Sequence, residues 1–186
     1  MSEFIKKYPT IGCCGLDCGL CPKYYTIGSS KCPGCCGSDF FNKHPSCSFI
    51  TCCVKKNKLE VCADCKEFPC SKFDGFDAHD SFITHRNSIS NLRFIKKYGM
   101  EEFIEQQGKR MKLLDTMLKH FNDGRSKSFY CIAVTLLSID DIEKALKKCE
   151  EIKTDDIKIK AKILKKFLNS SAAKKGTDLK LIRKMK

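Results

Sequence analysis

The chain has 186 residues, of which 15 are cysteine and none is tryptophan, and its formal net charge is +13 at pH 7. This length allows one compact domain, or one domain with an appendage. No stretch has the apolar length of a membrane span, and no signal-peptide-like run follows the N-terminal lysines. We therefore expect no membrane association, a cytoplasmic location and reduced cysteines, because disulfides persist only in oxidising compartments.

Thirteen of the cysteines lie between Cys13 and Cys70. Residues 11–72 contain no long apolar run, so this segment needs a further source of stability to offset its ordering entropy. Reduced cysteines at short spacings favour metal ligation, and an odd total leaves one thiol over in any complete disulfide scheme. The sequence therefore predicts a small, irregular, metal-stabilised cysteine-rich part over residues 11–72.

Three Cys-x-x-Cys pairs are the strongest metal-binding signal in this segment. Each pair can bring two sulfurs to one ion, so two pairs complete a tetrahedral site. Together with flanking single cysteines they predict ten ligands: Cys14, Cys18, Cys21, Cys32, Cys35, Cys47, Cys52, Cys62, Cys65 and Cys70. The doublet partners Cys13, Cys36 and Cys53 are weaker candidates. Ten thiolates fill two four-ligand sites with two left over, and thirteen are enough for three.

Two kinds of metal centre remain open. Two or three structural Zn²⁺ ions are preferred, because zinc suits an all-cysteine ligand set in Gly- and Pro-rich turns and supplies folding free energy. A [4Fe–4S] cluster is the alternative, because Cys14, Cys18 and Cys21 have the Cys-x3-Cys-x2-Cys spacing of radical SAM enzymes and Pro22 follows the last of them. Nothing downstream resembles the repeated βα units of a radical SAM barrel. His44 is a candidate nitrogen ligand, although a solvated loop histidine is the preferred interpretation.

The rest of the chain has helical periodicity, which predicts a helical part over residues 73–169 packed on the cysteine-rich part and a mostly α fold overall. In chain order, helices are expected near 89–98, ending at Gly99, and near 100–121. The apolar run 129–137 is compatible with helix or strand, with helix preferred. Ser138 matches an N-terminal cap for a helix to about residue 152. A last helix is expected over 155–168, with a buried face made of Ile159, Ile163, Leu164, Phe167 and Leu168.

Positive charge is concentrated at the end of the chain. Residues 158–186 carry 11 basic side chains against one acidic side chain. Lys158–Lys186 is therefore a candidate nucleic-acid-binding surface, because its basic side chains would attract the phosphates of the nucleic-acid backbone. A solvated amphipathic helix, followed by a basic, flexible tail over residues 170–186, is the preferred interpretation.

The cysteine motifs together resemble an uncharacterised family of bacterial and archaeal proteins, a domain of unknown function for which zinc binding has been suggested. The resemblance lies in Cys14-Gly-Leu-Asp-Cys18-Gly-Leu-Cys21-Pro-Lys-Tyr24, in Cys32-Pro-Gly-Cys35, in Cys47-x4-Cys52 and in Cys62-Ala-Asp-Cys65-Lys-Glu-Phe-Pro-Cys70, and it extends through Glu101-Glu-Phe103. It covers residues 11 to about 110 and implies that the ten cysteines of the shared pattern are ligands. Cys13, Cys36 and Cys53 lie outside that pattern.

These observations predict a metal-binding protein that acts as a structural or interaction module. A partner protein would bind the surface of its cysteine-rich part. Electron transfer or cluster supply by an iron–sulfur protein and nucleic-acid binding by the basic tail are the alternatives. No nucleophile, general base or cofactor loop is visible, so the sequence does not favour an enzyme. Cys131 and Cys149 lie in apolar surroundings and are expected to behave as small buried hydrophobes.

Overall fold

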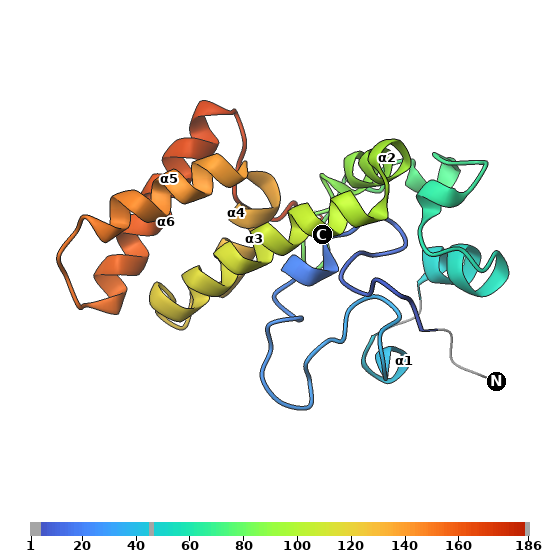
Figure 1. Cartoon of the computed structure of the whole chain (residues 1–186), viewed down its shortest axis with the longest axis horizontal. Coiled ribbons are helices and arrows are strands. Elements are labelled where there is room, and N and C mark those ends of the chain that lie inside the picture. Colours follow the sequence, from blue (N-terminus) through green and yellow to red (C-terminus); the bar gives the residue numbers. More distant parts are fainter. Residues whose placement is uncertain (1–4, 45–46, 185–186) are drawn as a thin grey trace. The chain divides into compact units, whose positions relative to one another are not determined.

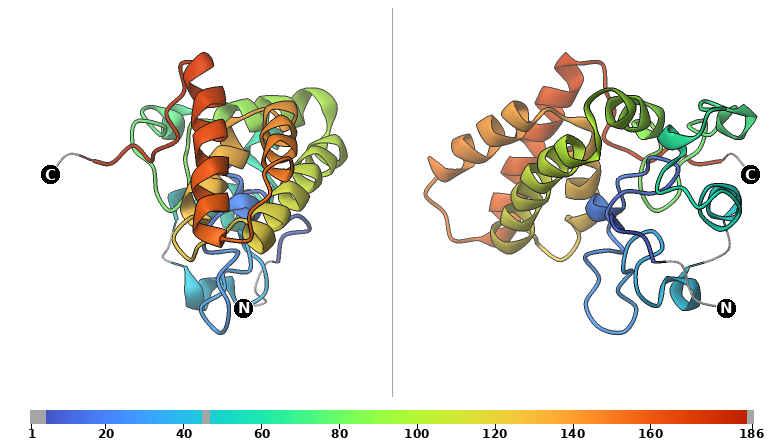
Figure 2. Two further views of the ribbon diagram at one scale, coloured as in Figure 1. Left: turned by 90° about the vertical axis from the view of Figure 1, so that its left-hand side faces the viewer. Right: turned by 45° about the vertical axis from the view of Figure 1, so that its right-hand side comes forward.

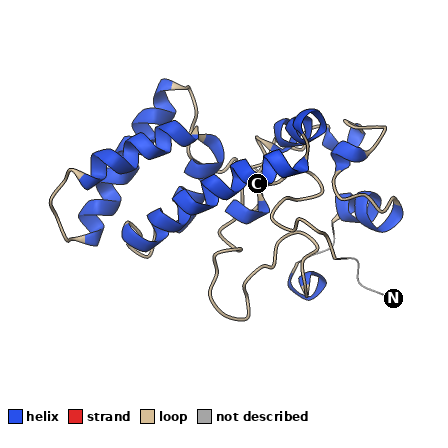
Figure 3. Cartoon of the chain, viewed as in Figure 1, coloured by secondary structure: helices blue, strands red, loops and turns tan. Residues whose placement is uncertain are grey.

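The computed structural model describes residues 5–44 and 47–184. Within these two ranges the chain forms helices and loops and contains no strand (Figure 3). The predicted mostly α fold, with its cysteines gathered in the N-terminal part, is confirmed. Stabilisation of that part by metal stays a prediction.

Contacts along the chain divide it into two compact units. The first runs to Gln107 and is completed by the residues from Ile182 onward, and the second is Gly108–Leu181. The predicted boundaries at residues 72 and 169 follow composition, whereas this division follows contacts. Helix α3, Met100–His120, begins in the first unit and ends in the second (Figure 1).

Short helical turns separated by loops make up the cysteine-rich part of the first unit. They are Cys18–Leu20, α1 (Phe40–Lys43), the π-helical turn Ile50–Lys56, Cys62–Asp64 and Ser71–Phe73. Two of the Cys-x-x-Cys pairs are 3-10 turns in which the second cysteine donates its N–H to the carbonyl of the first. These hydrogen bonds are 3.2 Å for Cys21 to Cys18 and 3.1 Å for Cys65 to Cys62. A two-residue spacer is therefore long enough for one hydrogen-bonded turn and no more.

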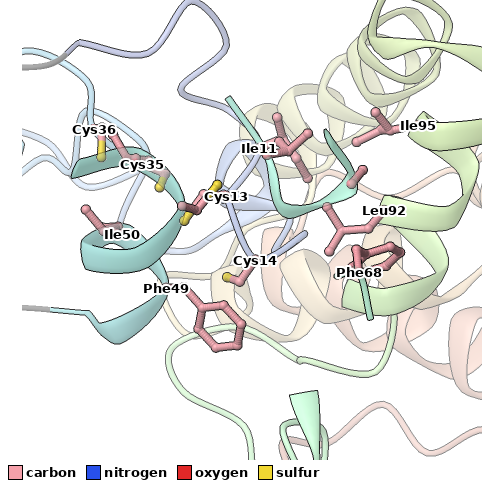
Figure 4. Packing of buried hydrophobic residues seen from close by; sticks show 14 of the residues in the cluster. Ile11, Cys13, Cys14, Cys35, Cys36, Phe49, Ile50, Phe68, Leu92 and Ile95 are labelled. Carbon is pink, nitrogen blue, oxygen red and sulfur yellow. The ribbon is translucent and has the colours of Figure 1, made fainter. Parts of the chain in front are cut away.

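The first unit has an apolar core in spite of its lack of apolar runs (Figure 4). Its apolar side chains occur singly along the chain, and the turns bring them together. The buried apolar residues include Ile11, Phe40, Phe49, Ile50, Val54, Val61, Phe68 and Phe73, with Leu92 and Ile95 from helix α2 (Ser88–Tyr98). Helix α2 packs against the turn Cys62–Asp64. Buried cysteine sulfurs are part of this same core, so apolar packing and thiol chemistry share one volume.

The second unit is built from α4 (Lys127–Leu136), α5 (Ile139–Glu150) and α6 (Ile157–Lys174), together with the end of α3. Helix α5 packs against both α4 and α6, and the two views of Figure 2 show α5 and α6 side by side. The apolar run 129–137 is helical, as preferred from the sequence. Among the described helices, none combines the length and the apolarity that crossing a lipid bilayer requires.

Two helix ends bear on the sequence predictions. The Ser138 hydroxyl accepts a hydrogen bond of 3.3 Å from the Asp141 N–H, which confirms the predicted cap of α5. Helix α6 continues to Lys174, beyond the predicted end at Leu168. Its buried stripe is Ala161, Leu164, Leu168 and Ala172, so the prediction that Ile159 is buried is wrong, and 47% of Ile159 is exposed.

The segment after α6 makes defined contacts. Leu179 is buried. Asp80 N–H donates to the Ile182 carbonyl at 2.8 Å, and Ile182 N–H donates to Asp80 Oδ2 at 2.8 Å. Residue 182 is thereby held against the first unit. The last two residues of the predicted tail, 185–186, lie outside the described residues.

Candidate metal-binding cysteine site

Two cavities of the first unit are lined by cysteine side chains. The larger one has a volume of about 450 Å³, and seven cysteines line it: Cys13, Cys14, Cys18, Cys21, Cys32, Cys35 and Cys47. The smaller one has a volume of about 30 Å³, and five cysteines line it: Cys52, Cys53, Cys62, Cys65 and Cys70. We call them the large cavity and the small pocket.

The ten cysteines predicted as ligands divide six to four between the large cavity and the small pocket. The pairs Cys18/Cys21 and Cys32/Cys35 lie together in the large cavity, and Cys62/Cys65 lies in the small pocket. The Cys47–Cys52 pair is separated, because Cys47 lines the large cavity and Cys52 lines the small pocket. The two cysteines of each Cys-x-x-Cys pair therefore line one cavity, whereas Cys47 and Cys52 line different ones.

The weaker candidates take up different places. Cys13 lines the large cavity and Cys53 lines the small pocket, whereas Cys36 lines neither cavity. Within residues 5–44 and 47–184, no three His, Cys, Asp or Glu side chains are grouped closely enough to hold a metal ion. A tetrahedral zinc site places its sulfurs about 3.8 Å apart, as Zn–S bonds of about 2.3 Å require. Zinc binding in either cavity would therefore draw the surrounding sulfurs inward.

Five cysteines form a series in which each thiol shifts the pKa of the next. In order they are Cys36, Cys35, Cys13, Cys53 and Cys62. Figure 4 shows Cys13, Cys35 and Cys36 at one end of this series. We refer to it as the thiol chain. Its members come from four separate stretches of sequence, and the fold alone brings them together.

The pKa shifts alternate in direction along the thiol chain. Hydrogen bonds from Cys13 and Cys36 hold the pKa of Cys35 well below its ordinary value. Hydrogen bonds from Cys13 and Cys62 likewise lower the pKa of Cys53 to about 4. The pKa values of Cys13, Cys36 and Cys62 are raised by donating to those acceptors. The lowered pKa values thus fall on Cys35 and Cys53, and the Cys53 Sγ also lies 3.6 Å from the Leu59 carbonyl oxygen.

The cysteines beside the thiol chain favour the neutral thiol when no metal is bound. Burial raises the pKa of Cys14 to about 12, and burial also raises the pKa values of Cys18 and Cys21. A bound cation reverses this preference, since a coordinating thiol is deprotonated. Metal binding at these positions would accordingly release protons.

A buried ammonium group lies beside the thiols. The side chain of Lys6 is 0% exposed, and its Nζ donates to the Ile11 carbonyl at 2.7 Å and lies 3.8 Å from Glu60 Oε1. Its charge favours the thiolate forms of Cys18, Cys35, Cys36 and Cys53. The sequence analysis missed Lys6 because a lysine near the start of a lysine-rich chain has no distinguishing local pattern.

The loop that carries Cys14 and Cys18 is tied to two helices through Asp17. Asp17 Oδ2 accepts a hydrogen bond of 2.8 Å from Asn91 of α2, and Oδ1 accepts one of 3.1 Å from Gln107 of α3. Asn91 also donates to the Gly15 carbonyl at 2.9 Å. Gly15 has a φ of +87°, and a Cβ there would lie 2.2 Å from the Ser88 carbonyl oxygen. This loop is therefore held rigidly against α2.

The small pocket has an apolar wall and one amide donor. Phe49, Phe68 and Phe73 line it, and the rings of Phe49 and Phe73 lie 4.9 Å apart. Asn57 Nδ2 donates to the Cys52 carbonyl at 2.8 Å and lies 3.7 Å from Cys52 Sγ. Apolar surroundings with a donor to sulfur are the outer-shell features that orient metal-binding thiolates.

The large cavity is bordered by polar and cationic side chains as well as by cysteines. Lys23, Lys43 and His44 line it. The His44 ring stacks on Phe40 at 4.6 Å, so this histidine is placed beside the predicted ligands. His85 is different, because its Nδ1 and Nε2 lie 2.9 Å from the Phe76 carbonyl and from the Ser81 hydroxyl. Both ring nitrogens of His85 thus have partners other than sulfur.

The remaining sequence candidates lie in the second unit. Cys131 and Cys149 are buried, in agreement with the expectation for small hydrophobes. The lysines of α6 are mostly exposed, and Lys165 lies 3.8 Å from Asp123. Nucleic-acid binding through Lys158–Lys186 stays a prediction.

Comparison of the chain with protein-family models, with curated proteins and with solved structures gives no significant match. The resemblance to the uncharacterised cysteine-rich family therefore stays a prediction from the motifs, and the function is argued from the site alone.

Proposed function

We propose that this protein binds metal ions through the thiolates of its large cavity and small pocket, and that zinc in these two centres stabilises the first unit. The main support for this proposal is the position of the cysteines, since twelve of the thirteen in the cysteine-rich part line these two cavities. Thiolate is a soft donor that suits zinc and iron–sulfur clusters.

The small pocket fits a single ion. Its volume of about 30 Å³ is close to the volume of one water molecule in the liquid. Cys52, Cys62, Cys65 and Cys70 supply four thiolates, which is the full ligand set of a structural zinc site. Four protein thiolates leave no open coordination position, so this centre would be structural.

The large cavity is too large for one ion. Its volume is about 450 Å³, and seven cysteines surround it. This volume supports a second candidate function, in which the large cavity holds an iron–sulfur cluster and the protein transfers electrons or supplies the cluster. Cys14, Cys18 and Cys21 then provide three ligands, with the fourth from Cys32, Cys35 or Cys47.

The test is to purify the full chain without oxygen and to measure zinc, iron and acid-labile sulfide per chain. Zinc without colour supports the leading proposal, and a brown protein with equal iron and sulfide supports the second candidate. Protein that retains neither metal and binds neither on reconstitution overturns both.

Two variants separate the centres. Cys65→Ser changes the small pocket and Cys18→Ser changes the large cavity, and Cys149→Ser is the control because it replaces a buried cysteine of the second unit. We expect each of the first two variants to lose the metal of its own centre, while the control keeps the full content. Equal metal content in all three would contradict ligation by these cavities.

Stabilisation by metal has its own measurement. Removal of the metal by a strong chelator should abolish hydrogen-exchange protection in the first unit, while α5 and α6 keep theirs, because structural zinc contributes folding free energy directly. An apo protein with unchanged protection in the cysteine-rich part would show that the apolar core alone holds the fold.

A further inference from the structure

A groove lies between helices α5 and α6, which pack side by side in the second unit (Figure 2). Its volume is about 400 Å³. The residues that line it recur at helical spacings of three and four residues, so they form one stripe on each helix. They are Asp141, Lys144, Ala145 and Lys148 of α5 and Phe167, Ser170, Ser171, Lys174 and Lys175 at and beyond the second half of α6. We call this feature the α5–α6 groove.

Two contacts between the helices cross the α5–α6 groove, one at each end. The ammonium of Lys175 forms an ion pair with the carboxylate of Asp141. The Nζ atom of Lys148 lies 5.6 Å from the centre of the Phe167 ring, a distance at which the ring attracts a cation. The first contact joins the start of α5 to the end of α6, and the second joins the end of α5 to the middle of α6. The two helices therefore run antiparallel along the groove.

The side chains between these two contacts leave a hollow. Ala145 is 3% exposed and, like Ser170 and Ser171, is too short to fill the space. Lys144 and Lys174 are long and exposed. The groove thus combines small residues, two hydroxyl groups and several ammonium groups.

Most of the positive charge that lines the groove is not neutralised by a carboxylate. Of the described residues that line it, Asp141 alone is acidic, and it is paired with Lys175. The ion pairs of the described residues include none of Lys144, Lys148 and Lys174. Like charges on both sides of one groove raise the local positive potential, which attracts an anion.

We propose that the α5–α6 groove binds a polyphosphate anion, a ligand in which two or more phosphate groups are linked directly. A lysine ammonium binds phosphate as a point charge, and a serine hydroxyl can donate a hydrogen bond to a phosphate oxygen. The volume of about 400 Å³ falls within the range of about 300–1,000 Å³ that is typical of small-molecule sites. One phosphate group would leave most of this volume empty, whereas a chain of phosphates presents negative charge along the groove.

This proposal does not depend on metal binding, since no cysteine lines the groove. It also differs from nucleic-acid binding by Lys158–Lys186. It requires two lysines of α5, Lys144 and Lys148, and no lysine from the first half of α6.

The test uses inorganic tripolyphosphate as the probe and isothermal titration calorimetry of the full chain as the measurement. We expect saturable binding of one tripolyphosphate per chain, with an affinity that falls as the salt concentration rises, because salt screens exposed charges. Absence of binding at low salt would overturn the proposal. Tripolyphosphate also chelates metal ions, so the assignment is decided by variants that have the same cysteines.

Two triple variants separate the groove from the overall charge. Each replaces three exposed lysines by glutamine, so both lower the net charge equally. The groove variant is Lys144→Gln, Lys148→Gln and Lys174→Gln, and the control is Lys158→Gln, Lys162→Gln and Lys166→Gln. We expect the groove variant to bind tripolyphosphate at least about tenfold more weakly, because contacts to charged groups are lost, and the control to keep the natural affinity. Equal weakening in the two variants would show attraction to net charge alone and would overturn the site.

Ser170→Phe tests the shape of the groove at constant charge. The phenyl ring would occupy the hollow, so we expect tripolyphosphate binding to be lost. Asn169→Phe is the control, because Asn169 is an exposed neighbour that does not line the groove, and it should keep the affinity. Circular dichroism checks that both variants retain their helices. Equal affinity of the two folded variants would place the bound phosphates outside the groove.

A single-stranded RNA oligonucleotide supplies the other source of phosphate, in which sugars separate the phosphate groups. Fluorescence anisotropy of labelled RNA with the same two triple variants measures whether the groove takes it. RNA binding that needs the groove lysines, without binding of tripolyphosphate, would overturn the polyphosphate assignment in favour of a nucleic-acid backbone. Tripolyphosphate binding that needs the groove lysines, with RNA binding equal in the two variants, would support it.

Discussion

The carboxylate of Asp17 accepts a hydrogen bond of 2.8 Å from the side-chain amide of Asn91, which joins the first cysteine loop to helix α2. A second hydrogen bond, from Gln107, occupies the other oxygen of the same carboxylate. Asp17 is 6% exposed, so these amides replace the water that a carboxylate needs. The loop that presents Cys14 and Cys18 thus takes its position from two helices more than seventy residues away in sequence.

Asp17→Asn should destabilise the first unit. The new amide would place an N–H₂ group against the donor of Asn91 or Gln107, and one buried donor would lose its acceptor, which costs about 1–3 kcal/mol. The urea midpoint of the first unit is the measurement. Asp74→Asn makes the same chemical change at an exposed position of this unit and should leave the midpoint unchanged. Equal midpoints for the two variants would contradict the described role of Asp17.

Gly15→Ala and Gly28→Ala form a second matched pair. The two glycines have nearly equal φ values, +87° and +86°, so alanine pays the same left-handed backbone cost of roughly 1–2 kcal/mol at either position. Only at Gly15 would the new Cβ also meet the Ser88 carbonyl oxygen, whereas at Gly28 nothing lies within 4 Å. We expect Gly15→Ala to lose a further ~1–3 kcal/mol of unfolding free energy through overpacking. Indistinguishable unfolding curves would show that the loop can move away from α2.

Lys6→Met tests the buried ammonium. Methionine keeps most of the volume and removes the charge that favours thiolate at Cys35 and Cys53, so we expect metal affinity to fall roughly tenfold, the equivalent of about 1.4 kcal/mol. Competition with a chromogenic chelator measures it. Lys7→Met, at an exposed neighbour, should keep the affinity, and Lys6→Arg should retain most of it. Unchanged metal affinity in Lys6→Met would show that the charge of Lys6 does not contribute to metal binding.

The ion pair between Asp141 and Lys175 predicts a pH-dependent contribution to the second unit. The Lys175 ammonium and the Ser138 hydroxyl lower the pKa of Asp141. Because the pKa is lower in the folded state, the stabilisation is present above the unfolded value of about 4 and disappears as the pH falls through the folded value. At pH 7, Asp141→Asn should cost about 0.5–1 kcal/mol, and near pH 2 it should cost little.

Asp140→Asn is the control for this prediction. Asp140 lies in the same first turn of α5 but is exposed, and it shares the helix-dipole interaction without the ion pair. Thermal unfolding across the acid range should separate the two variants at neutral pH and bring them together in acid. A constant difference at every pH would exclude ionisation of Asp141 as its cause.

The sequence predicts the helices of this protein better than its site. Helices α2 and α3 follow from periodicity and from Gly99 between them, and the cap of α5 follows from Ser138. The apolar run 129–137 is ambiguous, because a wholly apolar segment has no periodicity to distinguish helix from strand. Ile159 is misassigned because the buried stripe of α6 is made by the small residues Ala161 and Ala172 together with leucines.

Within the site, spacing predicts which cysteines are near each other and not which cavity they line. Cys47 and Cys52 are five residues apart and line different cavities: Cys47 precedes the π-helical turn Ile50–Lys56, whereas Cys52 lies within it. The thiol chain, Lys6 and Asp17 depend on contacts between distant segments, so no local pattern indicates them. The apolar core is missed for a related reason, since its side chains occur singly and are gathered only by folding.

The hydrogen bonds between Asp80 and Ile182 have a consequence for the order of events during synthesis. The cysteine-rich part leaves the ribosome first, yet its unit receives residue 182 only after the whole second unit has been made. The thiols of the cysteine-rich part would therefore be exposed to oxidants and to competing metals while the rest of the chain is translated. A metal bound before that point would stabilise the incomplete first unit. The hydrogen bonds of Ile182 to Asp80 would form only after the chain has been translated to residue 182.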